Sequence, residues 1–144
     1  MSVLKLRRAN LLDVRVLFDL RNHPKIREQS INTSKISLDQ HKKWFNKVML
    51  DGSKKILIAE KGESFIGMIR FEKTNDSHLI SWAISSEFQG QGLGKELVGS
   101  AVKRMNEDSL IAKIKKKNIA SIKIAEHIGM KLTKEAKGML FYQK

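Results

Sequence analysis

The segment Gln89-Gly90-Gln91-Gly92-Leu93-Gly94 constrains this chain more than any other. It lies between an apolar, strand-like run at 79–84 and a helical pattern that begins at Leu93, so it joins a strand to a helix. Unpaired N–H groups and the positive end of the helix dipole gather at the start of a helix, and glycine lets the backbone approach an anion closely. The segment therefore predicts a phosphate-binding turn.

Spacing separates three kinds of glycine-rich turn. A dinucleotide-binding turn has the pattern G-x-G-x-x-G, but Lys95 stands where its third glycine is needed. A P-loop needs G-x-x-x-x-G-K-[ST], and here Gln89 replaces the first glycine while Glu96 replaces the hydroxyl residue. The pattern that remains is Q/R-x-x-G-x-G/A, which Gln89, Gly92 and Gly94 satisfy.

Apolar spacing predicts the other elements of a single domain covering residues 1–144. An Asn10 cap precedes a helix with Leu12, Val16 and Leu20 on one face, and Pro24 is expected to end it. Further helices should begin near Ser37, at 93 and at 118, and strands should cover 3–7, 56–59, 65–69, 79–84, 110–114 and 139–142. The class is α/β, with a mixed, mostly antiparallel sheet of six to seven strands and about four helices.

A second motif follows one helix and one strand after the glycine turn. Asn118, Ser121 and the pair Gly129-Met130 stand at offsets of zero, three, eleven and twelve. With these two motifs in this order, the chain from about Ile56 onward resembles the GCN5-related N-acetyltransferase (GNAT) superfamily.

That resemblance implies acetyl-CoA as acetyl donor, with the turn on its pyrophosphate and a splayed central strand pair around its pantetheine arm. The implied donor-binding residues are Trp82, Ile84, Gln89, Gly90, Gln91, Gly92, Leu93, Gly94, Lys95 and Asn118. Trp82 and Ile84 also suit a plain core strand, and Asn118 also suits a helix cap.

The catalytic residues of several family members do not carry over. A glutamate five residues before the asparagine and a tyrosine seven after it serve as base and acid there, but this chain has Lys113 and Ala125. The chemistry is therefore expected to depend on positioning, with the amine deprotonated through water. Candidate catalytic groups are His78, Ser81 and Tyr142, with Glu72 as a further water anchor.

The N-terminal part resembles the amino-sugar N-acetyltransferases of pseudaminic-acid and related surface-polysaccharide pathways. The similarity rests on the Arg21-Asn22-His23-Pro24 turn and on His41 in the following helix. It implies that Arg21, Asn22, His23 and His41 lie near the acceptor. A helix end, a core position or a solvated charge would also account for these residue types.

Composition limits the classes of molecule that the chain is expected to bind. The net charge of +13 attracts polyanions such as nucleic acid, anionic lipid or phosphorylated small molecules. There is no cysteine, and the four histidines lack metal-motif spacing, so no metal is expected. The N-terminal residues lack the apolar stretch of a signal peptide, and no run approaches membrane-span length, which favours a cytoplasmic protein.

The favoured hypothesis is acetyl transfer from acetyl-CoA to a primary amine of a nucleotide-linked amino sugar. Acetylation of a ribosomal protein or another protein N-terminus is the second enzymatic hypothesis. A nucleic-acid-binding module is the alternative from another class, motivated by the charge and by the lysines at 113 and 115–117. The aromatic residues of this chain occupy apolar positions and do not alternate with these lysines, so nucleic acid is the less favoured partner. A homodimer is left open.

Overall fold

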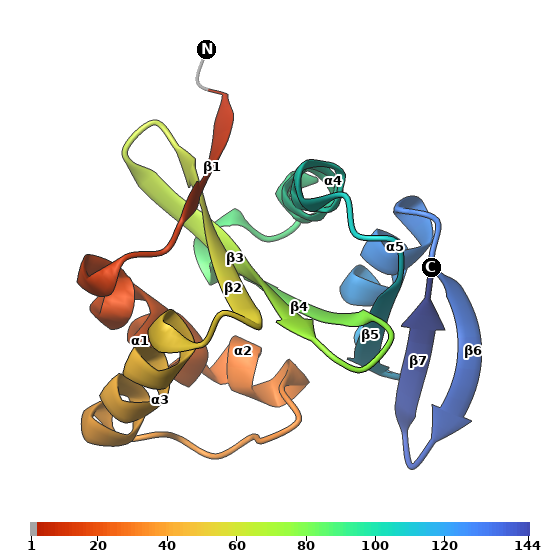
Figure 1. Ribbon diagram of the computed structural model, residues 1–144, viewed down its shortest axis with the longest axis horizontal. Helices are drawn as coiled ribbons and strands as arrows, with labels where there is room; N and C mark the ends of the chain where they lie inside the picture. Colours follow the sequence, from red (N-terminus) through yellow and green to blue (C-terminus); the bar gives the residue numbers. More distant parts are fainter. Residues whose placement is uncertain (1–2) are drawn as a thin grey trace.

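The computed structural model describes residues 3–144, which form one seven-stranded sheet with five α-helices around it (Figure 1). The strand order is β1-β2-β3-β4-β5-β7-β6. The strands are β1 Leu4–Arg8, β2 Lys54–Lys61, β3 Ser64–Lys73, β4 His78–Ile84, β5 Leu110–Lys115, β6 Lys131–Ala136 and β7 Met139–Gln143. The helices are α1 Val14–Asn22, α2 Pro24–Gln29, α3 Leu38–Leu50, α4 Leu93–Met105 and α5 Ile119–His127, with 3-10 turns η1 Leu11–Asp13 and η2 Ser86–Phe88. The expected mixed, mostly antiparallel α/β fold is confirmed.

The central strands β4 and β5 run parallel and then separate. They pair at His78 with Leu110 and at Leu79 with Ile111, although β4 continues to Ile84 and β5 to Lys115. Beyond these pairs the two strands diverge (Figure 1). This confirms the expected splayed central pair, and it leaves backbone hydrogen-bonding groups without a strand partner along the gap.

Two cores hold helices against the two faces of the sheet. On one face, α1 and α3 pack Leu17, Phe45 and Val48 against Ile56 and Ile58 of β2. On the other, α4 and α5 cover a larger cluster drawn from β2–β5 and β7. Full burial of a side chain of this size contributes about 2 kcal/mol, so each helix layer is firmly attached. Figure 1 shows α1, α2 and α3 gathered on one side of the sheet and α4 and α5 on the other.

The first helical stretch differs from the prediction. Asn10 and Asp13 form a capping box as expected, but they cap the 3-10 turn η1, and α1 starts only at Val14. The 3-10 turn changes the helical phase, so Leu12 is 90% exposed and Leu17 is buried with Leu20. The predicted face of Leu12, Val16 and Leu20 is therefore wrong at Leu12.

Pro24 ends one helix and also starts another. Its restriction on His23 keeps that residue extended, which closes α1 at Asn22 as predicted. Proline is also well suited to the first turn of a helix, and here it begins the short helix α2, which the apolar pattern did not indicate because α2 buries no residue. Strand β6 escaped prediction for the same reason: it is exposed from Lys131 to Glu135.

Candidate active site

The glycine turn leaves the start of α4 open. Gly90 and Gly92 have φ of 80° and 77°, a conformation that disfavours any side chain. Gly92 is the N-cap of α4 and supplies no side-chain cap, so the first N–H groups of the helix remain available. A Cβ atom added at either glycine would meet nothing within 4 Å. An open, amide-lined concavity of this kind fits a pyrophosphate.

The other positions of the motif hold the turn in place. The Gln89 amide nitrogen donates to the carbonyl of Ile84 at 3.0 Å and so fixes the turn to the end of β4. A Cβ atom at Gly94 would lie 2.7 Å from Cδ1 of Ile124, so glycine there permits close packing of α4 on α5. Leu93 is buried in the core, and Gln91 is exposed and bonds the carbonyl of Glu87 at 3.4 Å.

Backbone alternation decides which amides of β4 face the gap. The Ser85 amide donates to Ile66 on β3, whereas the His78 amide donates to Ser109 just before β5. Because successive N–H groups of a strand point to opposite sides, Trp82 and Ile84 share the side of His78. Their amides therefore face the gap, where a pantetheine arm could pair with them as a further strand would.

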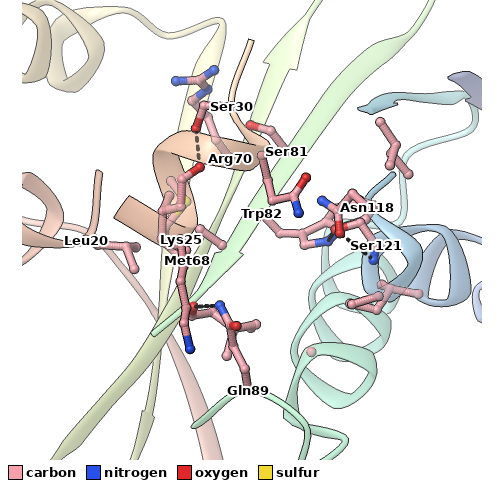
Figure 2. Close-up of a pocket in the computed structure, with 18 of the residues that line it drawn as sticks. Leu20, Lys25, Ser30, Met68, Arg70, Ser81, Trp82, Gln89, Asn118 and Ser121 are labelled. Atoms are coloured by element: carbon pink, nitrogen blue, oxygen red, sulfur yellow. Dashed lines mark hydrogen bonds between the residues drawn. The ribbon is translucent and has the colours of Figure 1, made fainter. Parts of the chain in front are cut away.

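The second motif lies on the far side of this gap. The side-chain Oδ1 of Asn118 accepts a hydrogen bond from the Ser121 amide at 3.2 Å and caps α5. The Ser121 hydroxyl in turn accepts the indole N–H of Trp82 at 3.1 Å, and Figure 2 shows these three side chains grouped together. The cap expected for Asn118 is thus present, and its side chain also lines the cavity described next.

A single cavity of about 1080 Å³ contains the gap, the glycine turn and the inner side of α1 and α2. Sites for one small ligand are usually smaller than about 1,000 Å³, so the volume suits two substrates that meet. Of the expected donor-binding residues, the lining includes Trp82, Ile84, Gln89, Gly90, Gly92, Gly94, Lys95 and Asn118. Gln91 and Leu93 lie outside it.

One row of side chains crosses the sheet on the side of α1 and α3. Ile56, in the core with those helices, pairs with Arg70, and Arg70 pairs with Ser81. Continuing the β4–β5 register places Ser81 across the gap from Lys113, which pairs with Phe141 of β7. Arg70, Ser81 and Lys113 all line the cavity. Along this row Ser81 therefore lies between two cationic residues, at the point where the sheet opens.

Two arginines converge on one indole in this part of the cavity. The guanidinium carbons of Arg21 and Arg70 lie 5.3 and 5.5 Å from the ring centre of Trp44. Burial lowers the pKa of both arginines below the ordinary value, and the charge of Arg70 lowers that of Arg21 further. Among residues 3–144, neither arginine forms a salt bridge. An anion placed beside them would offset this like-charge repulsion.

His41 is buried beside these arginines and contributes to the cavity wall. It is 1% exposed, and its Nε2 donates to the carbonyl of Val14 at 2.9 Å. Its Nδ1 is buried without a hydrogen-bond partner among the described residues. Burial lowers the pKa of His41 more than the Val14 bond raises it, and Arg21 lowers it further. The ring is therefore neutral, with an unused acceptor.

The residues of the Arg21-Asn22-His23-Pro24 turn have different structural roles. Arg21 reaches the cavity. Asn22 exchanges two hydrogen bonds with the backbone of Ile36, at 2.8 and 2.9 Å. His23 caps α2 through Nδ1, and its Nε2 is hydrogen-bonded to the Ser86 hydroxyl at 3.1 Å. Asn22 and His23 thus brace the turn and do not line the cavity.

The structure does not bring the remaining catalytic candidates to the cavity. His78 stands at the paired end of β4, with Nδ1 3.5 Å from a Glu107 carboxylate oxygen. Tyr142 is 4% exposed in the core, and burial, followed by the charge of Glu126, raises its pKa. Glu72 binds Lys54 at 3.2 Å. Ser81 alone of these candidates lines the cavity.

Sequence reasoning missed part of the lining. Arg70 was not singled out, although a charged residue inside an apolar strand such as 66–71 was a usable signal. Trp44 stands at the helical spacing typical of a core position, yet it is only half-buried. Lys25, Glu28 and Ile31 reach the cavity from α2 and the loop after it, which carry no apolar periodicity.

Within residues 3–144, no group of three or more His, Cys, Asp or Glu side chains could hold a metal ion. In the same part of the chain, no helix combines the length and apolarity needed to span a membrane.

Comparison with known proteins identifies the class. Residues 4–131 match the acetyltransferase (GNAT) domain family, and the chain belongs to that family. It is an N-acetyltransferase that uses acetyl-CoA as its acetyl donor.

Individual relatives differ in their acceptors. The chain is 28% identical to the acetyltransferase PseH of Campylobacter jejuni over 80% of this chain and 74% of that protein. Its fold is similar to spermidine N-acetyltransferase of Vibrio cholerae, solved with CoA and spermine, with a TM-score of 0.85, 18% identity, and coverage of 97% and 92% of the two chains. It is also similar to a ribosomal-protein-alanine N-acetyltransferase of Brucella melitensis, with a TM-score of 0.80, 23% identity, and coverage of 97% and 98%.

Proposed function

We propose that this enzyme acetylates a primary amine on an anionic small molecule, with a nucleotide-linked amino sugar as the acceptor class. The observation that carries the proposal is the pair Arg21 and Arg70 on Trp44, which lines the cavity without a carboxylate partner. A phosphate or diphosphate fits two converging guanidinium groups, since these donate paired hydrogen bonds to such oxygens. The similarity to PseH supports the same acceptor class.

The charge of the cavity argues against a polycationic acceptor. Arg21, Lys25, Arg70 and Lys113 line its acceptor side, and the one carboxylate in the lining is that of Glu28. A polyamine would meet like charges there, which disfavours binding.

In the proposed reaction the chain acts mainly by positioning. The turn at 90–94 binds the pyrophosphate, and the amides of Trp82 and Ile84 pair with the pantetheine arm. Arg21 and Arg70 hold the acceptor phosphates. Ser81 anchors the amine, or a water molecule that takes its proton, at the centre of the gap. Holding two reactants in this way supplies much of the rate acceleration without a dedicated base.

Acceptor screening with acetyl-CoA tests the proposal. UDP-, dTDP- and CMP-linked amino sugars, the corresponding free amino sugars, a ribosomal-protein N-terminal peptide and spermidine would be compared by release of free CoA thiol. We expect turnover with a nucleotide-linked sugar and little with its free sugar, because only the former has phosphates for Arg21 and Arg70. Preference for the peptide or for spermidine would overturn the acceptor assignment.

A nucleic-acid-binding role is distinguished by a separate measurement. Acetyl-CoA should raise the melting temperature saturably, whereas RNA binding should be weak at physiological salt and fall steeply with added salt. Tight RNA binding without any stabilisation by acetyl-CoA would favour nucleic-acid binding over acetyl transfer.

A further inference from the structure

Lys113 is a lysine of the cavity wall whose amine takes no part in the proposed reaction. It lines the cavity from β5, is exposed, and lies across the gap from Ser81 by the β4–β5 register. The gap opens immediately before this position, since the last β4–β5 pair is Leu79 with Ile111. A lysine side chain here can reach the point at which the strands separate.

The Lys113 amine has no competing ion pair. Among residues 3–144 it forms no salt bridge, and its nitrogen lies 5.8 Å from the ring centre of Phe141. By contrast, the neighbouring Lys115 donates to the carbonyl of Glu28 at 2.8 Å. Lys134 shares the same Phe141 ring at 5.4 Å, but it belongs to the edge strand β6 and lies outside the cavity.

We propose that Lys113 is a self-acetylation site of this enzyme when no acceptor is bound. The inference rests on acetyl-CoA lying in the gap, as proposed above, and does not depend on which acceptor the enzyme takes. The unprotonated Nζ attacks the thioester carbonyl carbon, an N–C bond forms, the C–S bond breaks, and CoA leaves as thiolate. The proton lost from nitrogen passes through water to that thiolate, so the products are Nε-acetyl-lysine and free CoA.

The modification would also alter the acceptor side of the cavity. Acetylation removes the positive charge of Lys113 and leaves a neutral amide in the row that contains Arg70 and Ser81. An anionic acceptor should then bind less tightly. A bound acceptor would occupy the space between Lys113 and the thioester, so it should protect Lys113 from acetylation. Self-acetylation should therefore increase when the acceptor is scarce.

Peptide mass spectrometry after incubation with acetyl-CoA alone tests the inference. We expect one acetyl group, located on Lys113, to appear at least about tenfold faster than on Lys134, because of these two lysines Lys113 alone lines the cavity that holds the thioester. Lys134 is the matched internal control, since both amines contact the same ring and differ in access to the cavity. Equal labelling of the two lysines, or faster labelling of Lys95 or Lys123, would overturn the assignment.

Two variants separate the inference from the proposed function. Lys113→Arg keeps the charge and should lose the acetyl group while it retains stabilisation by acetyl-CoA. Gly92→Val should lose both. If wild type is stabilised by acetyl-CoA and turns over an acceptor but Lys113 stays unmodified, self-acetylation is wrong and the proposed function stands. If acetyl-CoA does not stabilise the wild type, the proposed donor site itself is wrong.

Discussion

The indole N–H of Trp82 donates a hydrogen bond to the Ser121 hydroxyl at 3.1 Å, and this bond connects the two sides of the split sheet. Trp82 belongs to β4, while Ser121 belongs to α5, which follows β5. Where β4 and β5 no longer pair, this side-chain bond holds the two walls of the cavity together.

Removing the acceptor of this bond should loosen that wall. Ser121→Ala leaves the Trp82 N–H without its partner, and we expect a loss of about 1 kcal/mol in unfolding free energy. Urea unfolding measures this loss, and the KM for acetyl-CoA should rise. Trp82→Phe in the same background removes the orphaned donor, so the two substitutions should not be additive. Additive losses would show that the bond contributes nothing.

Gly92 is expected to be essential for donor binding. Gly92→Val places a β-branched residue at a φ of 77° and should strain the backbone by roughly 1–2 kcal/mol. We expect loss of CoA binding by calorimetry with the fold retained by circular dichroism. Gly138→Val is the matched control, because Gly138 has φ 78° and open space but lies in the β6–β7 turn. The control should show similar strain and unchanged CoA affinity.

Gly94 is expected to act through packing. In Gly94→Ala the new methyl group would lie 2.7 Å from Cδ1 of Ile124, the flexible end of a side chain. We expect a destabilisation of up to about 1 kcal/mol, since the Ile124 side chain must leave its preferred rotamer to avoid the new methyl group. Adding Ile124→Val removes that Cδ1 and should restore most of the loss in a thermal unfolding assay. If the pair is no better than Gly94→Ala alone, the close approach is not the cause.

Stability should fall as the pH drops below about 6.5 because of His41. Burial lowers the pKa of His41 from its ordinary value of 6.5, so the unfolded chain binds a proton at this position before the folded chain does. The unfolding free energy therefore decreases as the pH falls from about 6.5 towards the folded pKa. Urea unfolding of wild type and His41→Gln between about pH 5 and 7.5, the range in which histidine ordinarily titrates, isolates the contribution of His41 to the pH dependence of the unfolding free energy. An identical slope in both proteins would exclude His41 as its source.

Arg70 should contribute to acceptor affinity through its charge. For an anionic acceptor, Arg70→Gln should raise KM about tenfold and affect kcat less. A tenfold rise in KM corresponds to the loss of about one hydrogen bond to a charged group. Arg15→Gln is the matched control, because Arg15 also stacks on an aromatic ring, that of Phe18, but lies outside the cavity. Added salt should diminish the difference between wild type and Arg70→Gln.

The family, the glycine turn and most of the helices and strands could be predicted from the sequence. The turn at 89–94 and the cap at Asn118 could be predicted because their backbone conformation and capping depend on adjacent residues. The strands at 56–59, 65–69 and 79–84 could be predicted because each is a short apolar run bounded by turn residues. Strand β6 and helix α2 could not, since neither buries an apolar face.

The side chains that meet on the acceptor side of the cavity could not be predicted from the sequence, because they come together only in the folded chain. Sheet register and the splay place Arg70 of β3 and Lys113 of β5 on either side of Ser81. Packing of α1 and α3 on the sheet brings Arg21 to the same Trp44 ring as Arg70. Strand alternation also decided against Tyr142: it pairs with Ala112 and faces the core, whereas Phe141, one residue earlier, pairs with Lys113 on the cavity side. Convergence of this kind depends on how strands are paired, which residue type and local spacing do not specify.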